Sequence, residues 1–234
     1  MELRRLRAVL FDLDGTLCRY TVGVADAILG AIRRLHLPED ALGDLQAAAG
    51  RYTSLWRDHE GTQDALGRVR ATVWQHLLAE HPQVDPALAS PLAEAYGAIR
   101  TPSVRLYPGA RELLVDLRRR FRLGLLTNGP SEMQWSKIRG NEIESLFDAI
   151  AVAGDTGVYK PDPRAFAVLL ERLHVDAGDA VYVGDSLAMD VAGAHAASLR
   201  SVWISRNGET PAADPALAPD HTIHDLDELR KVLL

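Results

Sequence analysis

The sequence is poor in cysteine, since its 234 residues include only one, Cys18. A single cysteine cannot form a disulfide within its own chain, so a disulfide-stapled scaffold is excluded. The sequence also lacks a set of cysteine and histidine residues at the spacing of a zinc site. Because 47% of the residues are hydrophobic, we expect an ordinary buried core to stabilise the chain instead.

Long apolar runs and an excess of positive charge are also missing. Only residues 8–11 are apolar between the basic start and Asp12, which is too short for a signal peptide, and no other run approaches the length that spans a membrane. The formal net charge of −6 gives no long-range attraction to nucleic acid or anionic lipid. We therefore expect a cytoplasmic protein with neither a membrane nor a nucleic acid as its partner.

Lysine is the third scarce residue. Of the 26 basic residues only three are lysines, Lys137, Lys160 and Lys231, and the others are arginines. Nearly every position that needs only a positive charge therefore carries arginine. A lysine beside a candidate functional motif is therefore stronger evidence of a specific role than it would be in a lysine-rich sequence.

Short apolar runs that end in polar loops alternate with amphipathic stretches along much of the chain. Such runs are typical of buried strands, and the amphipathic stretches are typical of helices. The expected strands are residues 8–11, 122–126, 180–183 and 201–204, and the expected helices between them are residues 111–120, 163–174 and 189–197. This alternation predicts an α/β fold with a Rossmann-like, three-layer core, in which helices cover both faces of a parallel sheet.

Residues 17–103 show a different pattern. Helical periodicity runs through residues 22–35, 40–57, 62–77 and 85–99, and no convincing strand interrupts it. At about 150 residues per domain, the chain is too long for one ordinary domain and too short for two. We therefore expect an α-helical domain, residues 17–103, inserted into a core made of residues 1–16 and 104–234.

Four carboxylates follow the expected strands, at the ends where an open parallel sheet binds ligands. Asp12 and Asp14 follow the first strand, and Asp185 and Asp190 follow the third. Two such charges about 4 Å apart repel each other by roughly 4 kcal/mol at an effective dielectric of about 20, so carboxylates gathered at one edge need a cation among them. Carboxylate, carbonyl and water oxygens are the ligands that Mg²⁺ prefers, and we expect a magnesium ion here.

Three other polar residues suit a phosphate group. Lys160 precedes the expected helix at residue 163 and supplies a second positive charge, while Thr127 and Asn128 offer a hydroxyl and loop amides after the second strand. Each motif also has an ordinary interpretation, because Asp-x-Asp and Thr-Asn-Gly occur in turns and Lys-Pro-Asp-Pro begins a helix. Their conjunction at the strand ends of one sheet favours a phosphate site.

The spacing of Asp12 and Asp14 also indicates how two acids could divide the chemistry. If extended geometry continues through both residues, their side chains project to the same side and flank one substrate atom. A carboxylate bound to the metal stays ionised and can attack, whereas one away from the metal can carry a proton to the leaving group.

With these motifs the chain resembles the haloacid dehalogenase superfamily of hydrolases, in the phosphatase branch that has a helical cap inserted after the first motif. The resemblance covers nearly the whole chain and depends on four segments in the order and spacing of the family. They are Phe11-Asp12-Leu13-Asp14-Gly15-Thr16-Leu17, Leu125-Leu126-Thr127-Asn128-Gly129, Lys160-Pro161-Asp162-Pro163, and Gly184-Asp185-Ser186 through Asp190.

The resemblance implies a catalytic role for each matching residue. Asp12 would attack phosphorus and form an aspartyl-phosphate, while Asp14 would protonate the leaving alcohol and then activate water. Thr127 and Asn128 would hold the phosphoryl oxygens, and Lys160 would offset charge on the nucleophile and the transferring group.

The resemblance also implies a set of metal ligands. They are the Asp12 carboxylate, the Asp14 backbone carbonyl and Asp185. Asp190 would act through water or by orienting Lys160. The implied cofactor is Mg²⁺ and the implied partner is a small-molecule phosphate ester.

Three alternatives stand beside the prediction of a magnesium-dependent phosphomonoester hydrolase that acts on a small phosphorylated metabolite. A 2-haloacid dehalogenase of the same superfamily lacks the second aspartate of the first motif, so Asp14 argues against it. A sugar phosphomutase keeps both aspartates, but Thr16, where such mutases often have valine, favours hydrolysis. A binding or regulatory module with a decayed site has usually lost the nucleophile, the lysine or an acid, and all are present here. The departures from the family pattern at Met189 and Ser198 remove none of these groups.

Overall fold

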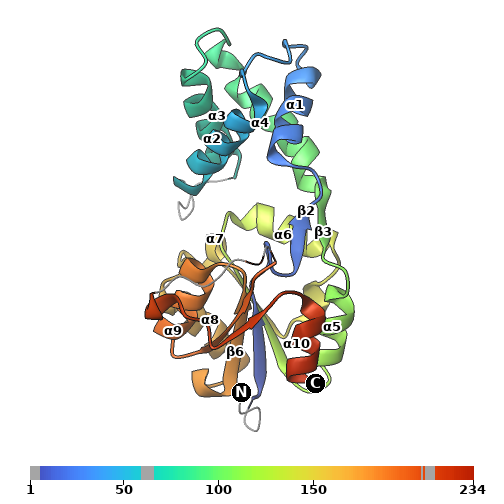
Figure 1. Cartoon of the computed structure of the whole chain (residues 1–234), viewed down its shortest axis with the longest axis vertical. Helices are drawn as coiled ribbons and strands as arrows, with labels where there is room; N and C mark the ends of the chain where they lie inside the picture. The colour runs from blue at the N-terminus through green and yellow to red at the C-terminus, as the bar shows by residue number, and fades with distance from the viewer. Residues whose placement is uncertain (1–5, 59–65, 207, 209–213) are drawn as a thin grey trace. The chain divides into compact units, whose positions relative to one another are not determined.

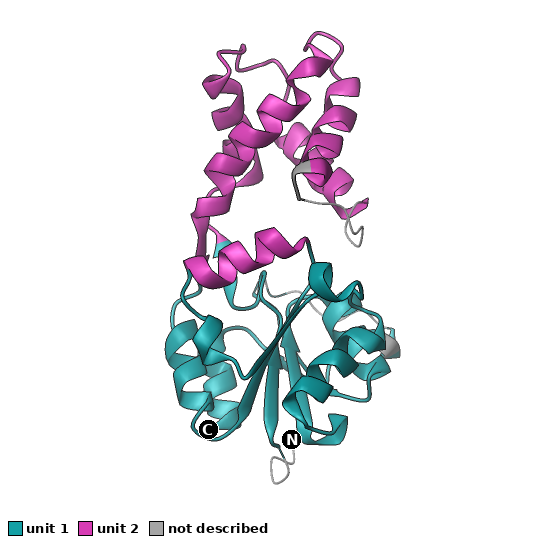
Figure 2. Cartoon of the chain, turned by 180° about the vertical axis from the view of Figure 1, so that it is seen from behind, with its two compact units in different colours: residues 1–19, 106–129, 141–234 teal, residues 20–105, 130–140 magenta. Residues whose placement is uncertain are grey.

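The computed structural model describes residues 6–58, 66–206, 208 and 214–234. The chain forms two compact units, which Figure 2 colours separately. Unit 1 comprises residues 1–19, 106–129 and 141–234, and unit 2 comprises residues 20–105 and 130–140. The expected insertion, residues 17–103, therefore supplies most of unit 2. Unit 2 also contains residues 130–140, which the sequence predicts as part of the core.

Unit 1 is built around a six-stranded sheet in which every neighbouring pair of strands is parallel (Figure 1). From one edge to the other, the strands are β5 (Ala149–Val152), β4 (Arg122–Thr127), β1 (Ala8–Phe11), β6 (Ala180–Gly184), β7 (Arg200–Ile204) and β8 (His221–Ile223). The four expected strands are β1, β4, β6 and β7, and the predicted α/β fold is confirmed. The edge strands β5 and β8 are not among the expected apolar runs, because they are only four and three residues long.

Helices cover both faces of this sheet (Figure 1). Helices α8 (Pro163–Leu173) and α9 (Ala192–Ala196) pack on one face, and α5 (Ala110–Leu117) and α10 (Leu226–Leu233) pack together on the other. The remaining short helices of unit 1 are η3 (Glu144–Leu146), α7 (Ala153–Thr156), η4 (Ala177–Asp179), η5 (Leu187–Val191) and η6 (Pro215–Leu217).

The packing of α8 on the sheet is close at Gly124 of β4. A β-carbon at this position would meet Leu10 at 2.7 Å and both Leu169 and Leu173 of α8 at 2.9 Å. Glycine therefore allows α8 to lie directly against the sheet. This contact fixes the position of the loop that precedes α8, and that loop carries Lys160.

Unit 2 is mainly helical. Its helices are α1 (Val24–Arg34), α2 (Leu45–Asp58), α3 (Leu66–Ala79), η1 (Pro86–Leu88), α4 (Ala89–Arg100), η2 (Thr101–Ser103) and α6 (Ser131–Gly140). Buried Tyr52, Trp74 and Tyr96, with ring centroids 4.7 to 6.1 Å apart, form the aromatic centre of its core. Residues 62–65 of the third predicted helix lie outside the described residues. Nowhere in the described chain is a helix long and apolar enough to span a membrane.

Two features of this region differ from the prediction. The segment 17–103 is not free of strands, because Cys18–Tyr20 forms β2, which pairs with β3 (Val104–Leu106) in a small two-stranded sheet. Three residues are too few to show a periodic pattern. Helix α6 was not predicted, because its buried side carries the polar residues Gln134 and Lys137 beside apolar ones, so no apolar stripe marks it in the sequence.

Candidate active site

The order of the strands brings the expected site residues to one edge of the sheet. β1 lies between β4 and β6. Asp12 directly follows β1, and its backbone N–H donates to the Val183 carbonyl of β6 at 2.9 Å. Thr127 ends β4 and Asp185 directly follows β6, so three loops meet at this edge, as the general rule for parallel sheets predicts.

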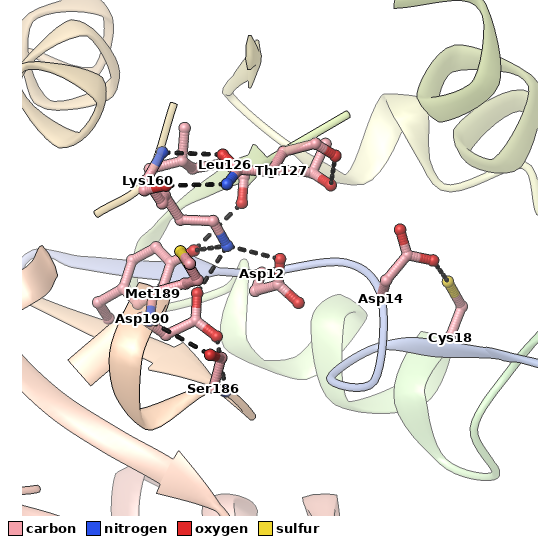
Figure 3. Close-up of polar contacts among 11 residues, drawn as sticks. Asp12, Asp14, Cys18, Leu126, Thr127, Lys160, Ser186, Met189 and Asp190 are labelled. Atoms are coloured by element: carbon pink, nitrogen blue, oxygen red, sulfur yellow. Dashed lines mark hydrogen bonds and ion pairs between the residues drawn. The ribbon is translucent and has the colours of Figure 1, made fainter. Parts of the chain in front are cut away.

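Lys160 lies among these loops and is only 5% exposed. Its ammonium group donates three hydrogen bonds, to Asp12 Oδ1 at 2.7 Å, to Asp190 Oδ1 at 2.6 Å and to the Tyr182 hydroxyl at 3.0 Å (Figure 3). Burial alone would lower the pKa of Lys160, but the charges of Asp12 and Asp190 outweigh it and raise that pKa well above its usual value. The lysine is therefore charged, and all three of its protons are engaged.

The Asn128 side chain holds the backbone of this lysine. Asn128 Oδ1 accepts from the Lys160 N–H at 2.8 Å, and Asn128 Nδ2 donates to the Lys160 carbonyl at 3.0 Å. Thr127, which is 1% exposed, donates from its hydroxyl to the Asn128 carbonyl at 3.3 Å. Two residues beyond Lys160, the Asp162 side chain caps α8 by accepting from the Arg164 N–H at 2.9 Å. The Lys160 loop is thus fastened at one side to the end of β4 and at the other to α8.

Asp190 is positioned by a π-helical turn. The helix expected at residues 189–197 begins as η5, a turn of this kind, and continues as α9; such turns are frequent at functional sites. Asp190 is 2% exposed, and its Oδ2 accepts from the Ser186 N–H at 2.9 Å. A β-carbon at Gly184 would lie only 2.3 Å from the Asp190 carboxyl carbon. Glycine at the end of β6 therefore makes room for this carboxylate.

Asp185 is the third acid of the cluster. Carboxylate oxygens of Asp12, Asp185 and Asp190 lie within 4.8 Å of one another. Although Asp185 as a whole residue is exposed, loss of water around its carboxyl, together with the charge of Asp190, raises the pKa of Asp185 to about 7. Gly15 has a φ of +84°, and a β-carbon there would lie 2.0 Å from Asp185 Oδ2. Glycine thus lets the loop after Asp14 touch Asp185.

Asp14 lies outside this cluster of carboxylates. Its Oδ1 accepts a weak hydrogen bond from Cys18 Sγ at 3.8 Å, and in Figure 3 its side chain lies apart from Lys160. The chain turns here, since the Cys18 N–H donates to the Leu13 carbonyl at 3.0 Å. β1 ends at Phe11 and the chain bends at Leu13, so the regular strand ends before Asp14, which pairs with Cys18 in an isolated β-bridge.

The acidic cluster fits a hard divalent cation. Both Asp190 oxygens are engaged, whereas Asp12 Oδ2 is buried and has no hydrogen-bond partner among the described residues. Burial raises the pKa of Asp12, and Lys160 offsets this effect only in part. When all three carboxylates are ionised, one ammonium leaves two of their negative charges uncompensated, and a divalent cation would compensate them. Carboxylates are ligands that Mg²⁺ prefers, so the residues present suit this ion.

Two side chains near the end of β7 support the acidic loops. Trp203 Nε1 donates to the Asp185 carbonyl at 2.8 Å. Arg206 donates from Nε to the Gly15 carbonyl at 3.1 Å and from Nη2 to the Thr16 carbonyl at 2.7 Å. Neither residue stands out in the sequence, because Trp203 lies within an apolar run and Arg206 is one of many arginines.

A serine, a histidine and an aspartate also meet beside β7, but they do not form a nucleophilic triad. Ser201 Oγ lies 2.9 Å and Asp220 Oδ2 lies 3.1 Å from the same ring nitrogen, His195 Nε2. In a triad the acid binds the other nitrogen and thereby orients the base. Asp220 also accepts from the Ser201 N–H at 2.8 Å, so this cluster ties β7 to the loop before β8.

The fit of Asp190 beside Gly184 can be tested by adding one methyl group. Gly184→Ala should lower the free energy of unfolding by about 1–3 kcal/mol, because the new β-carbon overlaps a buried carboxylate. Gly178→Ala is the matched control, since a β-carbon there meets no atom within 4 Å. Denaturant unfolding measures both variants, and equal stability of the two would contradict the packing described here.

Comparison with known proteins identifies relatives that match part or all of the chain. The model of a family described as haloacid dehalogenase-like hydrolases matches residues 6–198. The phosphoserine phosphatase of Thermus thermophilus is 39% identical over 145 residues, which cover 62% of this chain and 57% of that protein. The N-acylneuraminate-9-phosphatase of Homo sapiens is 30% identical over 240 residues, which cover 100% of this chain and 96% of that protein.

Two solved structures share the fold along nearly the whole chain. The putative HAD-hydrolase YfnB from Bacillus subtilis, in a structure bound to magnesium, has a TM-score of 0.78 at 28% identity and covers 98% of this chain and 99% of its own. A 2-haloacid dehalogenase from Pseudomonas syringae has a TM-score of 0.67 at 31% identity and covers 97% and 98%. Because the similar proteins include phosphatases and a dehalogenase, the individual residues of the site have to distinguish the two reactions.

Proposed function

Because the chain belongs to the haloacid dehalogenase-like hydrolase family, we propose that it is a magnesium-dependent phosphatase that hydrolyses small phosphate monoesters through a phosphorylated Asp12. One observation carries this proposal. Buried Lys160 binds one oxygen of Asp12 and leaves the other, Oδ2, without a hydrogen-bond partner among the described residues. The relatives named phosphoserine phosphatase and N-acylneuraminate-9-phosphatase support the class of reaction.

Asp12 is the nucleophile of the proposed reaction. Lys160 fixes its Oδ1 at 2.7 Å and β6 fixes its backbone N–H, so Oδ2 is the oxygen that attacks phosphorus. The attack forms a bond between Oδ2 and phosphorus, breaks the bond to the ester oxygen and leaves the phosphoryl group on Asp12. Water then attacks the phosphorus, which releases inorganic phosphate and restores the carboxylate.

Asp14 is the proposed proton carrier. Its carboxyl lies outside the cluster around Lys160, where it can hold a proton without breaking an ion pair in that cluster. It donates this proton to the leaving alcohol and later accepts one from the attacking water. Since a dehalogenase of the family lacks this second aspartate, Asp14 favours the phosphatase reaction.

The groups proposed to bind the phosphoryl oxygens are Thr127, Asn128 and Lys160. The Thr127 hydroxyl would donate to these oxygens in exchange for its 3.3 Å hydrogen bond to the Asn128 carbonyl. The Asn128 backbone N–H would donate as well, because the Asn128 side chain is used to hold the Lys160 backbone. Lys160 contributes a positive charge at the reaction centre, where charge develops in the transition state.

Asp185, the backbone carbonyl of Asp14, and Asp12 through the Oδ1 lone pair that Lys160 does not use are the groups that would hold Mg²⁺. The ion, when bound, supplies positive charge that stabilises the phosphoryl oxygens and the carboxylates. Asp190 stays outside this set because Lys160 and Ser186 engage its two oxygens. Its part is to keep Lys160 beside Asp12.

We assign residues 1–16 and 104–234 to the catalytic core and residues 17–103 to the cap. Every residue proposed for the chemistry belongs to unit 1, and most of the proposed cap belongs to unit 2, which has its own aromatic core.

Replacement of the nucleophile should stop the reaction. We expect Asp12→Asn to lower the rate of p-nitrophenyl phosphate hydrolysis in the presence of Mg²⁺ by at least about a thousandfold, as loss of a nucleophile does in other enzymes. Asp176→Asn is the control and should keep native activity, because this exposed aspartate of unit 1 makes no side-chain cap bond and has no part in the site. A fully active Asp12→Asn variant would refute the covalent mechanism.

The native protein and the Asp12→Asn variant also distinguish the phosphatase from the dehalogenase and the mutase. The native protein is incubated with 2-chloropropionate to detect chloride, and with a sugar phosphate to detect an isomer. Chloride release that requires Asp12 would show that the protein is a dehalogenase and not a phosphatase. An isomer formed without release of inorganic phosphate would show that the protein is a mutase. We expect only inorganic phosphate.

The scarcity of lysine allows a matched test of Lys160. Lys160→Met should lower kcat/KM by roughly 100- to 1000-fold, the usual effect of removing a group that stabilises transition-state charge. Lys231→Met, which changes an exposed lysine, should leave kcat/KM unchanged. If the two variants lost activity equally, the role given to Lys160 would be wrong.

Metal dependence is measured with the same assay. We expect EDTA to abolish hydrolysis and added Mg²⁺ to restore it. Asp185→Asn should raise the Mg²⁺ concentration for half-maximal activity by about 10- to 100-fold, since one ligand is weakened. Hydrolysis that continues at full rate in EDTA would exclude the proposed metal requirement.

A further inference from the structure

Tyr182 is a buried residue of β6 that has no part in the reaction proposed above. It is 1% exposed, and its ring packs edge-on against Phe166 of α8, with ring centroids 4.9 Å apart. Its hydroxyl lies 3.0 Å from Lys160 Nζ and 3.1 Å from the Leu126 carbonyl. A phenylalanine ring would fill the same space, so the partners of the hydroxyl indicate why a tyrosine is present.

Chemistry fixes the direction of both hydrogen bonds. An ammonium group can only donate, and a carbonyl oxygen can only accept. The Tyr182 hydroxyl therefore accepts a proton from Lys160 and donates its own to Leu126. Burial raises the pKa of Tyr182 well above its usual value, so the hydroxyl keeps the proton that this arrangement needs.

The hydroxyl completes the set of acceptors around Lys160. The ammonium group has three protons, and they go to Asp12 at 2.7 Å, to Asp190 at 2.6 Å and to Tyr182 at 3.0 Å. Without the hydroxyl, one buried N–H of Lys160 would lose its partner, and the ammonium could rotate between the two carboxylates.

The same hydroxyl also links Lys160 to β4. Leu126, whose carbonyl accepts from Tyr182, directly precedes Thr127. The Asn128 side chain makes the second link from this strand end to the Lys160 backbone. The side chain and the backbone of Lys160 are thus held by the strand end that carries the proposed phosphate-binding residues.

We propose that Tyr182 is a positioning residue, whose hydroxyl holds the Lys160 ammonium so that Asp12 Oδ1 stays bound and Oδ2 is left to react. The consequence for catalysis depends on the proposed phosphatase function, whereas the hold on Lys160 does not. Tyr182 touches neither substrate nor metal in this account and acts through Lys160.

The test is Tyr182→Phe, which removes the hydroxyl and keeps the ring. We expect kcat for p-nitrophenyl phosphate to fall about tenfold, the effect of one lost hydrogen bond to a charged group. KM should stay within about twofold of the native value, because the orientation of Lys160 matters most in the transition state. Tyr107→Phe is the control, since Tyr107 belongs to unit 1 but not to this network.

A second readout does not depend on activity. With only three lysines in the chain, NMR can resolve the ammonium group of each one, and Lys137→Arg and Lys231→Arg assign the signals. The protons of Lys160 should exchange slowly with water in the native protein, because they are buried and bonded. We expect Tyr182→Phe to shift this signal and to speed its exchange, and Tyr107→Phe to leave it unchanged.

Each outcome decides the inference. A shifted Lys160 signal together with a lower kcat supports it. An unchanged signal overturns it, even if kcat falls, because the loss would then reflect general packing. A shifted signal with unchanged kcat overturns the catalytic part of the inference. If the native protein hydrolyses no phosphomonoester at all, the proposed function fails, and the NMR measurement still decides whether Tyr182 holds Lys160.

Discussion

A buried ammonium group between two buried carboxylates is the interaction on which the site depends. Lys160, Asp12 and Asp190 are each no more than 5% exposed. Removing such ions from water costs on the order of several kcal/mol per ion, and mutual attraction offsets this only when the geometry is close and the remaining hydrogen bonds are made. The contacts at 2.6 and 2.7 Å meet the first condition. Ser186 and Tyr182 meet the second for Asp190 and Lys160, whereas Asp12 Oδ2 has no hydrogen-bond partner among the described residues.

The fold supplies this geometry from segments that are far apart in the sequence. The parallel order β4-β1-β6 places three loops at one edge of the sheet, and α8 lies close enough at Gly124 to bring the Lys160 loop beside them. Gly184 and Gly15 then leave space for two carboxylates where any side chain would collide. The packing of the backbone therefore holds the acids close together despite their mutual repulsion. The negative charge that Lys160 does not compensate suits a divalent cation.

Much of this arrangement is predictable from the sequence, because it depends on patterns within short segments of adjacent residues. The apolar runs of β1, β4, β6 and β7 and the Asp162-Pro163 start of α8 are patterns that adjacent residues determine. Parallel strands bring their carboxyl ends together, so the proximity of Asp12 and Asp185 follows from the order of the motifs. The roles given to these residues remain proposals, which the relatives support by analogy with their reaction class.

Other features depend on contacts that no local pattern encodes. The Tyr182 hydroxyl is hidden in an apolar run, and its importance is visible only once Lys160 is seen beside it. Arg206 holds a loop nearly two hundred residues away in the sequence. Helix α6 buries polar side chains and β2 has three residues, so periodicity reveals neither. Asp14 lies beyond the end of β1, inside a turn that the Leu13 carbonyl closes by accepting from the N–H groups of Leu17 and Cys18.

The central claim is that Asp12 carries the phosphoryl group during the reaction. The most direct measurement uses Asp14→Asn, in which water attack is slowed while a phosphate ester with a good leaving group can still react. The protein is mixed with p-nitrophenyl phosphate and Mg²⁺, quenched in acid and mapped by mass spectrometry of its peptides. The account predicts that a phosphoryl group accumulates on Asp12 and on no other residue. A phosphoryl group on a different side chain, or none during active turnover, would contradict it.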